Sequence, residues 1–120
     1  MTSLEGKTAL VTGASKGIGK AIALAFGEAG ANVVATARTQ SEIDEVTQAI
    51  TSNGSQALGV IADLGVESDI YELADTATQA FGAIDILVNN AAIIHPRIAI
   101  TDLDPDLWRD VLNVNLTGAF

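Results

Sequence analysis

The sequence has 120 residues, with 48% hydrophobic and 18% charged, a length and composition typical of one folded domain. It contains no cysteine, which excludes disulfide scaffolds and thiolate zinc sites, and no apolar run long enough to span a membrane. The net charge of −9 opposes binding to nucleic acid or to an anionic membrane surface. The first residues lack the pattern of a secretory signal, so we expect a cytoplasmic protein.

Short apolar runs alternate with segments of helical spacing along the whole chain. The runs predict strands over residues 8–12, 33–35, 57–62 and 84–88. The spacing of apolar residues predicts helices over residues 17–29, 41–50 and 68–81, followed by the terminating glycines Gly30, Gly54 and Gly82. Ser41 is the expected cap of the second helix, and Asp104 followed by Pro105 predicts the start of a fourth.

This alternation predicts an α/β fold. The strands are apolar on both faces, which is typical of a parallel sheet covered by helices on each side. We therefore expect a Rossmann-like doubly wound parallel sheet with its first four strands in the order 3-2-1-4. Residues 1–120 would form a single domain of this fold.

A cluster of glycines separates the first strand from the first helix. In the run Gly13-Ala-Ser-Lys-Gly17-Ile-Gly19, the missing Cβ atoms allow a sharp turn and a close approach by a ligand. The N–H groups at the start of the following helix attract a phosphate. The P-loop pattern does not fit, because Ala14 and Ala21 stand where it needs glycine and Ser or Thr. The G-x-G-x-x-G fingerprint fails as well, at Ile22.

The chain resembles the short-chain dehydrogenase/reductase family. Four motifs carry the resemblance in the family's order: Thr12-Gly13-x-x-x-Gly17-x-Gly19, Asp63-Leu64, Asn89-Asn90-Ala91-Ala92 and Asn113-Val-Asn115-Leu-Thr-Gly118. The third motif usually ends in glycine, so Ala92 adds slight crowding near the cofactor ribose. The resemblance implies hydride transfer between a nicotinamide cofactor and a small-molecule alcohol or carbonyl compound, and it implies that Asp63 touches the adenine.

The resemblance assigns roles to particular residues of this sequence. The expected cofactor-binding residues are Gly13, Ser15, Lys16, Gly17, Ile18, Gly19, Arg38, Asp63, Leu64, Asn90, Ala91 and Ala92. Of the family's catalytic set, only the asparagine is matched, at Asn115; the sole tyrosine, Tyr71, lacks a lysine four residues later. Asn115 follows Trp108 and Val111 at helical spacing, which predicts that it lies on a buried stripe. No cluster of His, Asp and Glu has metal-ligand spacing.

The second strand indicates which nicotinamide cofactor binds. NAD-binding members of such folds place an acidic residue after this strand, about 20 residues beyond the glycine turn. Residues 36–40 contain no carboxylate and include Arg38, while Lys16 lies within the turn. Both cations could pair with a 2′-phosphate, so we predict NADP(H) in preference to NAD(H).

The C-terminal residues have the pattern of an interrupted domain. The fourth helix runs into residues 117–120 without a stop signal, and the fourth strand would be an open edge. We therefore expect the N-terminal half of a longer enzyme, inactive alone and forming a homo-oligomer through that strand or helix. Two alternatives remain: a non-catalytic dinucleotide-binding or assembly module complete at this length, and a relative of nucleotide-sugar epimerases, whose glycine spacing differs at Lys16.

Overall fold

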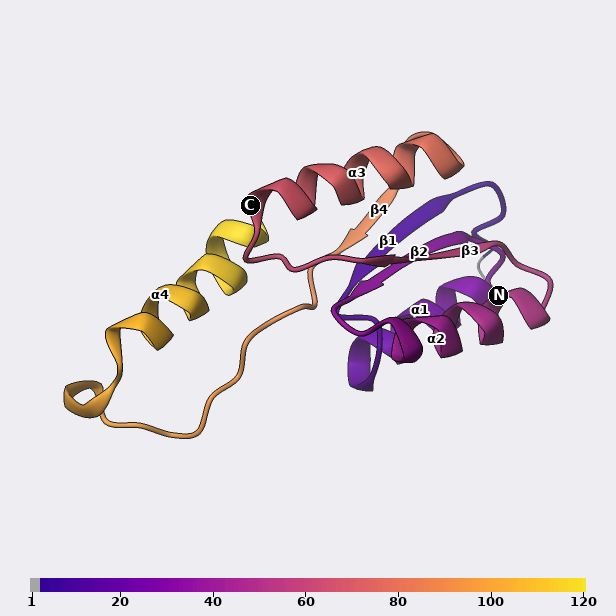
Figure 1. Ribbon diagram of the computed structural model, residues 1–120. Helices are drawn as coiled ribbons and strands as arrows, with labels where there is room; N and C mark the ends of the chain where they lie inside the picture. The colour runs from indigo at the N-terminus through magenta and orange to yellow at the C-terminus, as the bar shows by residue number, and fades with distance from the viewer. Residues whose placement is uncertain (1–2) are drawn as a thin grey trace.

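The computed structural model describes residues 3–120 and contains one parallel sheet (Figure 1). Its strands are β1 (Thr8–Thr12), β2 (Asn32–Ala37), β3 (Ala57–Ile61) and β4 (Ile86–Val88). They lie in the order β3-β2-β1-β4, with Leu10 aligned to Val34 of β2 and to Leu87 of β4. The predicted parallel sheet and its strand order are confirmed.

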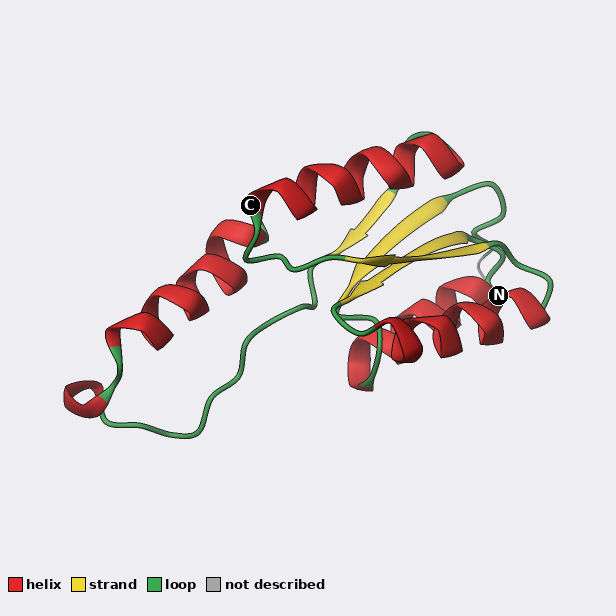
Figure 2. Ribbon diagram, viewed as in Figure 1, coloured by secondary structure: helices red, strands yellow, loops and turns green. Residues whose placement is uncertain are grey.

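Helices cover both faces of this sheet, as Figure 2 shows in red and yellow. The helices α1 (Gly17–Glu28) and α2 (Gln40–Ser52) lie on one face, and α3 (Glu67–Phe81) lies on the other. Successive strand residues point to opposite faces, so each face has its own core. One core joins Val33 and Ile43 under α1 and α2, and the second joins Val34 and Leu73 under α3.

The observed boundaries differ from the predicted ones by a few residues. The second helix begins at Gln40 with Thr39 as its N-cap, so the prediction that Ser41 caps it is wrong. Ser41 lies inside the first turn, where local sequence signals compete over two or three neighbouring polar residues. The strand expected over residues 84–88 is shorter, because only Ile86–Val88 pairs with β1.

Residues 89–120, which we call the C-terminal segment, extend away from the sheet (Figure 1). A long connection leads to a short 3₁₀ helix, η1 (Ile100–Asp102), then α4 (Pro105–Leu112), which continues as a π-helix, η2 (Asn113–Gly118). The side chain of Asp104 caps α4 as predicted, accepting a hydrogen bond from Asp106 N at 2.8 Å. Within the described residues 3–120, no helix is long and apolar enough to cross a membrane.

The prediction that Asn115 lies on a buried stripe is wrong. Asn115 is exposed, Trp108 keeps 49% of its surface, and neither α4 nor η2 contains a buried residue. The periodicity correctly indicated a helix with an apolar stripe, but α4 does not lie on either face of the sheet. An apolar stripe becomes a core only where a second surface covers it.

Candidate functional site

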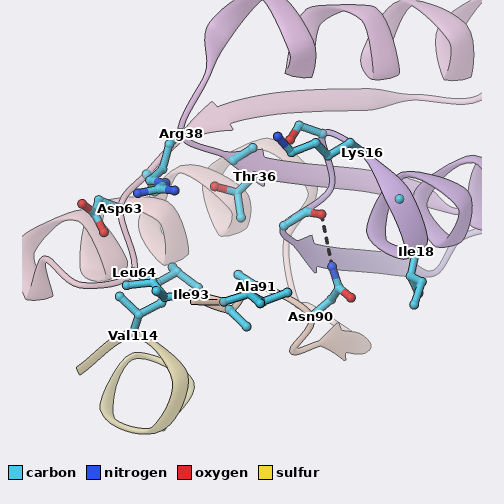
Figure 3. Close-up of a pocket in the computed structure, with 17 residues that line it drawn as sticks. Lys16, Ile18, Thr36, Arg38, Asp63, Leu64, Asn90, Ala91, Ile93 and Val114 are labelled. Carbon is cyan, nitrogen blue, oxygen red and sulfur yellow. Dashed lines mark hydrogen bonds between the residues drawn. The ribbon is translucent and has the colours of Figure 1, made fainter. Parts of the chain in front are cut away.

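A pocket of about 480 Å³ opens at the carboxyl ends of the strands (Figure 3). Strands β2 and β3 lie on one side of β1, and the chain then crosses to place β4 on its other side. The pocket lies at this change of side, next to the ends of β1 and β4. Open α/β sheets bind ligands at this point because the two connections diverge there and leave a crevice. The pocket is lined by Gly13, Ser15, Lys16, Gly17, Ile18, Thr36, Ala37, Arg38, Ala62, Asp63, Leu64, Asn90, Ala91, Ala92, Ile93, Ile94 and Val114.

The three glycines of the turn after β1 differ in what they do. Gly13 (φ +61°) lies against the end of β4, where an added Cβ would stand 2.9 Å from Asn90 Nδ2. A Cβ on Gly19 would collide with the Gly13 carbonyl, so this glycine allows α1 to begin directly on the turn. Gly17 (φ +59°) faces open space and therefore leaves its backbone accessible to a ligand.

Thr12 and Asn90 hold this turn to the end of β4. The Thr12 hydroxyl oxygen accepts hydrogen bonds from the backbone N–H groups of Asn90 and Ala91, each at 3.0 Å. The Asn90 side-chain amide donates to the carbonyls of Thr12 (3.2 Å) and Gly13 (3.1 Å). Thr12 is 4% exposed, so these polar groups are satisfied within the protein rather than by solvent. The glycine turn is consequently a supported structure, not a free loop.

The start of α1 presents backbone N–H groups without a side-chain cap. Its N-cap residue is Lys16, whose side chain makes no capping hydrogen bond, and the first turn contains no acidic residue. The first N–H groups of a helix have no partner within the helix, and its dipole adds positive potential there. This end of α1 opens into the pocket and suits an anionic group.

Cationic side chains flank the same part of the pocket. Figure 3 shows Lys16 and Arg38 with Thr36 between them, facing Asn90 and Ala91 across the cavity. Arg38 is exposed and follows β2 directly. Among residues 3–120, the one ion pair is Arg109–Asp106 on α4, so the Arg38 guanidinium is not bound to a carboxylate.

The loop after β3 forms the far end of the pocket. Asp63 Oδ1 accepts a hydrogen bond from Gly65 N at 2.8 Å, and Asp63 N donates to Asp69 Oδ2 at 2.9 Å. The carboxylate of Asp63 is thereby held in one orientation at the pocket wall. Leu64 lies beside it, close to Val114 of η2 (Figure 3).

Asn115 does not line the pocket, but it is tied to a residue that does. Its Oδ1 accepts from Ile93 N at 2.7 Å, and its Nδ2 donates to Ile93 O at 3.0 Å. The amide therefore pairs with both backbone groups of one residue, as a neighbouring strand would. The partners of this exposed amide are therefore backbone atoms of a single residue.

The structure brings the predicted binding residues together. Eleven of the twelve residues predicted to bind the cofactor line the pocket; Gly19 lies behind it under the turn. Sequence analysis missed Thr36, Ala37, Ala62, Ile93, Ile94 and Val114. Most of them flank predicted residues at strand ends, and this position could have indicated them. Val114 had no such signal, because only the docking of η2 brings it to the wall.

The fold and this pocket place the chain in the Rossmann class of α/β proteins. A family model described as short chain dehydrogenase matches residues 7–120, and the chain belongs to this family. Two solved structures have the same fold over 98% of this chain. One is a metagenomic short-chain oxidoreductase in complex with NADP, with 38% sequence identity and a TM-score of 0.93, and the match covers 53% of that chain. Another is a short-chain type dehydrogenase/reductase from Mycobacterium marinum, with 38% identity and a TM-score of 0.92, and the match covers 46% of that chain.

Curated relatives include oxidoreductases from bacteria and fungi. Glucose 1-dehydrogenase 2 of Bacillus subtilis (strain 168) is 43% identical over 118 residues, which are 98% of this chain and 46% of the relative. Versicolorin reductase of Emericella nidulans is 42% identical over 121 residues, a match that covers 98% of this chain and 44% of the relative. The chain therefore spans about half the length of the relatives it matches.

Proposed function

We propose that these 120 residues form the cofactor-binding part of an NADP(H)-dependent oxidoreductase. The observation that carries the proposal is the coincidence, in one pocket, of an uncapped helix N-terminus with Lys16 and the unpaired Arg38. A dinucleotide needs a cradle for its pyrophosphate, and its 2′-phosphate needs cations beside the adenosine ribose. The open face of Gly17 and the absence of a carboxylate in residues 36–40 fit both requirements.

The chemistry follows from the family and is supplied by the cofactor. A bound nicotinamide would exchange a hydride with the carbon of an alcohol or carbonyl substrate. The residues of this chain would bind and orient it: the α1 turn holds the phosphates, and Asn115 fixes Ile93 at the pocket wall. Since Asn115 alone matches the family's catalytic set, we expect these 120 residues to bind cofactor weakly and to show no turnover.

Calorimetric titration of NADP⁺ and NAD⁺ tests the cofactor preference. We expect tighter binding of NADP⁺, and we expect Arg38→Ala to weaken it by about 10-fold to 100-fold, as for a charge-assisted hydrogen bond, without changing NAD⁺ affinity. Arg97→Ala is the matched control, because Arg97 is exposed and does not line the pocket. Equal affinity for the two cofactors, unchanged by Arg38→Ala, would refute the NADP(H) preference.

We propose that the natural protein is longer than these 120 residues and that the 120-residue chain by itself self-associates. The relatives' greater length supports the first point, and the unpaired edge of β4 with exposed Leu87 supports the second. The intact mass of the polypeptide made from the natural gene tests the length: 12.3 kDa would favour a binding module complete at 120 residues. Light scattering tests self-association through β4 or α4, and a monomer at micromolar concentration would exclude it.

A further inference from the structure

The end of the last helix is attached to the loop that carries Asp63. Asn113, the first residue of η2, donates a hydrogen bond from Nδ2 to the carbonyl of Gly65 at 2.7 Å. These residues are 48 positions apart in the sequence. The bond therefore joins the C-terminal segment to the connection between β3 and α3.

Two glycines allow this attachment. A Cβ on Gly65 would stand 3.2 Å from Val114 Cγ2 and 3.4 Å from Asn113 Nδ2, and one on Gly118 would collide with the Leu64 carbonyl. Hydrogen bonds in a π-helix join residues five apart, so Asn113 and Gly118 lie one above the other on a common face. That face rests on the loop, and at Gly118 the helix backbone approaches the Leu64 carbonyl with no side chain between them.

Gly65 connects this attachment to the pocket through its two adjacent peptide groups. Gly65 accepts from Asn113 through its carbonyl, and its N–H donates to Asp63 Oδ1 at 2.8 Å. Asn113 thus orients Gly65, and Gly65 orients the carboxylate that lines the pocket. Val114, adjacent to Asn113, lines the pocket next to Leu64 (Figure 3). Asn113, which is outside the pocket, is therefore linked to a polar lining residue, Asp63, and to an apolar one, Val114.

We propose that Asn113 is a positioning residue for the base of a bound adenine nucleotide, acting through Gly65 on Asp63 and through Val114 on the apolar wall. This inference rests on the proposed function of the pocket as a dinucleotide site. According to this proposal, different side chains hold the two ends of the pocket in place. Thr12 and Asn90 hold the phosphate end, whereas Asn113 holds the end at Asp63 and Leu64.

Two ligands distinguish these parts. The probe 2′,5′-ADP carries a base and phosphates, and inorganic pyrophosphate carries no base. We expect Asn113→Ala to lower the affinity for 2′,5′-ADP by about threefold to tenfold, the contribution of one hydrogen bond, and to leave the affinity for pyrophosphate unchanged. Asn53→Ala is the matched control, since Asn53 is an exposed helix C-cap residue outside the pocket. Equal weakening of both ligands by Asn113→Ala would overturn the proposal, because it would indicate a general loss of structure.

A double-mutant cycle with Asp63→Ala tests the route of the effect. If Asn113 acts mainly through Asp63, Asn113→Ala should weaken 2′,5′-ADP by less than twofold in the Asp63→Ala background. Fully additive losses of affinity in the two single variants would overturn the proposal that Asn113 acts through Gly65 on Asp63. Hydrogen exchange of the Gly65 amide gives a readout without ligand: it should accelerate in Asn113→Ala and not in Asn53→Ala. If the unmodified chain binds neither probe, the proposed function fails, and unchanged exchange at Gly65 would separately refute the role of Asn113.

Discussion

The three-layer part of the molecule, residues 3–88, and the C-terminal segment, residues 89–120, are both rich in apolar residues but differ in burial. Every buried residue among those described lies in the first part, before residue 78. In the second part Ile94 is 91% exposed, Ile100 72% and Leu116 65%. Hydrophobic character alone therefore does not create a core. It does so in residues 3–88 because each apolar stripe meets a sheet face.

The two parts are also held by different forces. Apolar packing under α1, α2 and α3 stabilises the sheet. The C-terminal segment is attached instead by side-chain amides that donate to backbone carbonyls, from Asn90 to Gly13 and from Asn113 to Gly65. Within the segment, the Asn115 amide bonds to the backbone of Ile93. The bonds of Asn113 and Asn115 are exposed to solvent, so each contributes little to global stability. Their effect is on position, because they place Val114 and Ile93 at the pocket wall.

The largest expected contrast comes from removing one aliphatic side chain in each part. Ile43 is fully buried between α2 and the sheet, so Ile43→Ala should cost about 2 to 5 kcal/mol of unfolding free energy through lost burial and a cavity. Leu116→Ala should cost less than about 0.5 kcal/mol, because Leu116 is 65% exposed. Urea unfolding measures both. Similar losses would show that the C-terminal segment is packed in solution.

The next effect concerns the hydrogen bonds by which Thr12 of β1 holds the start of the C-terminal segment. Thr12→Val keeps the shape of the side chain but leaves the Ala91 N–H without an acceptor and the Asn90 N–H with only the Val88 carbonyl, at a cost of about 1 to 3 kcal/mol. Thr51→Val is the control, since that hydroxyl only donates to helix carbonyls on an exposed surface. Chemical denaturation compares the two variants. A loss no larger in Thr12→Val than in the control would contradict the supporting role of Thr12.

The smallest effect should be local. Asp104→Ala removes the cap that accepts from Asp106 N, which typically costs a helix about 1 kcal/mol. Because α4 has no buried residue, we expect faster amide exchange over residues 105–112 with no change in the urea midpoint. Asp110→Ala, on the same helix but without a capping role, should leave exchange unchanged. A shifted midpoint in Asp104→Ala would mean that α4 unfolds together with the sheet.

Much of the candidate site was accessible from sequence because it lies at strand ends. Strands were recognised as apolar runs, and the residues directly after them, such as Arg38 and Asp63, were assigned by position and family resemblance. The parallel sheet then brings these ends to one edge. Burial in the C-terminal segment could not be predicted in this way. The stripe of Trp108 and Val111 is a local pattern, whereas burial depends on a facing surface that the pattern does not describe.

The sequence by itself determined the α/β class, the strand order typical of doubly wound sheets, the glycine turn and the helix start at Asp104. These features depend on local properties: periodicity, missing Cβ atoms and capping groups act within a few residues. Only the tertiary structure decided that Gly19 supports the turn from behind, that Asn115 is exposed and that Asn113 meets Gly65. Such contacts join residues far apart in the chain, and their geometry exists only once the elements are packed.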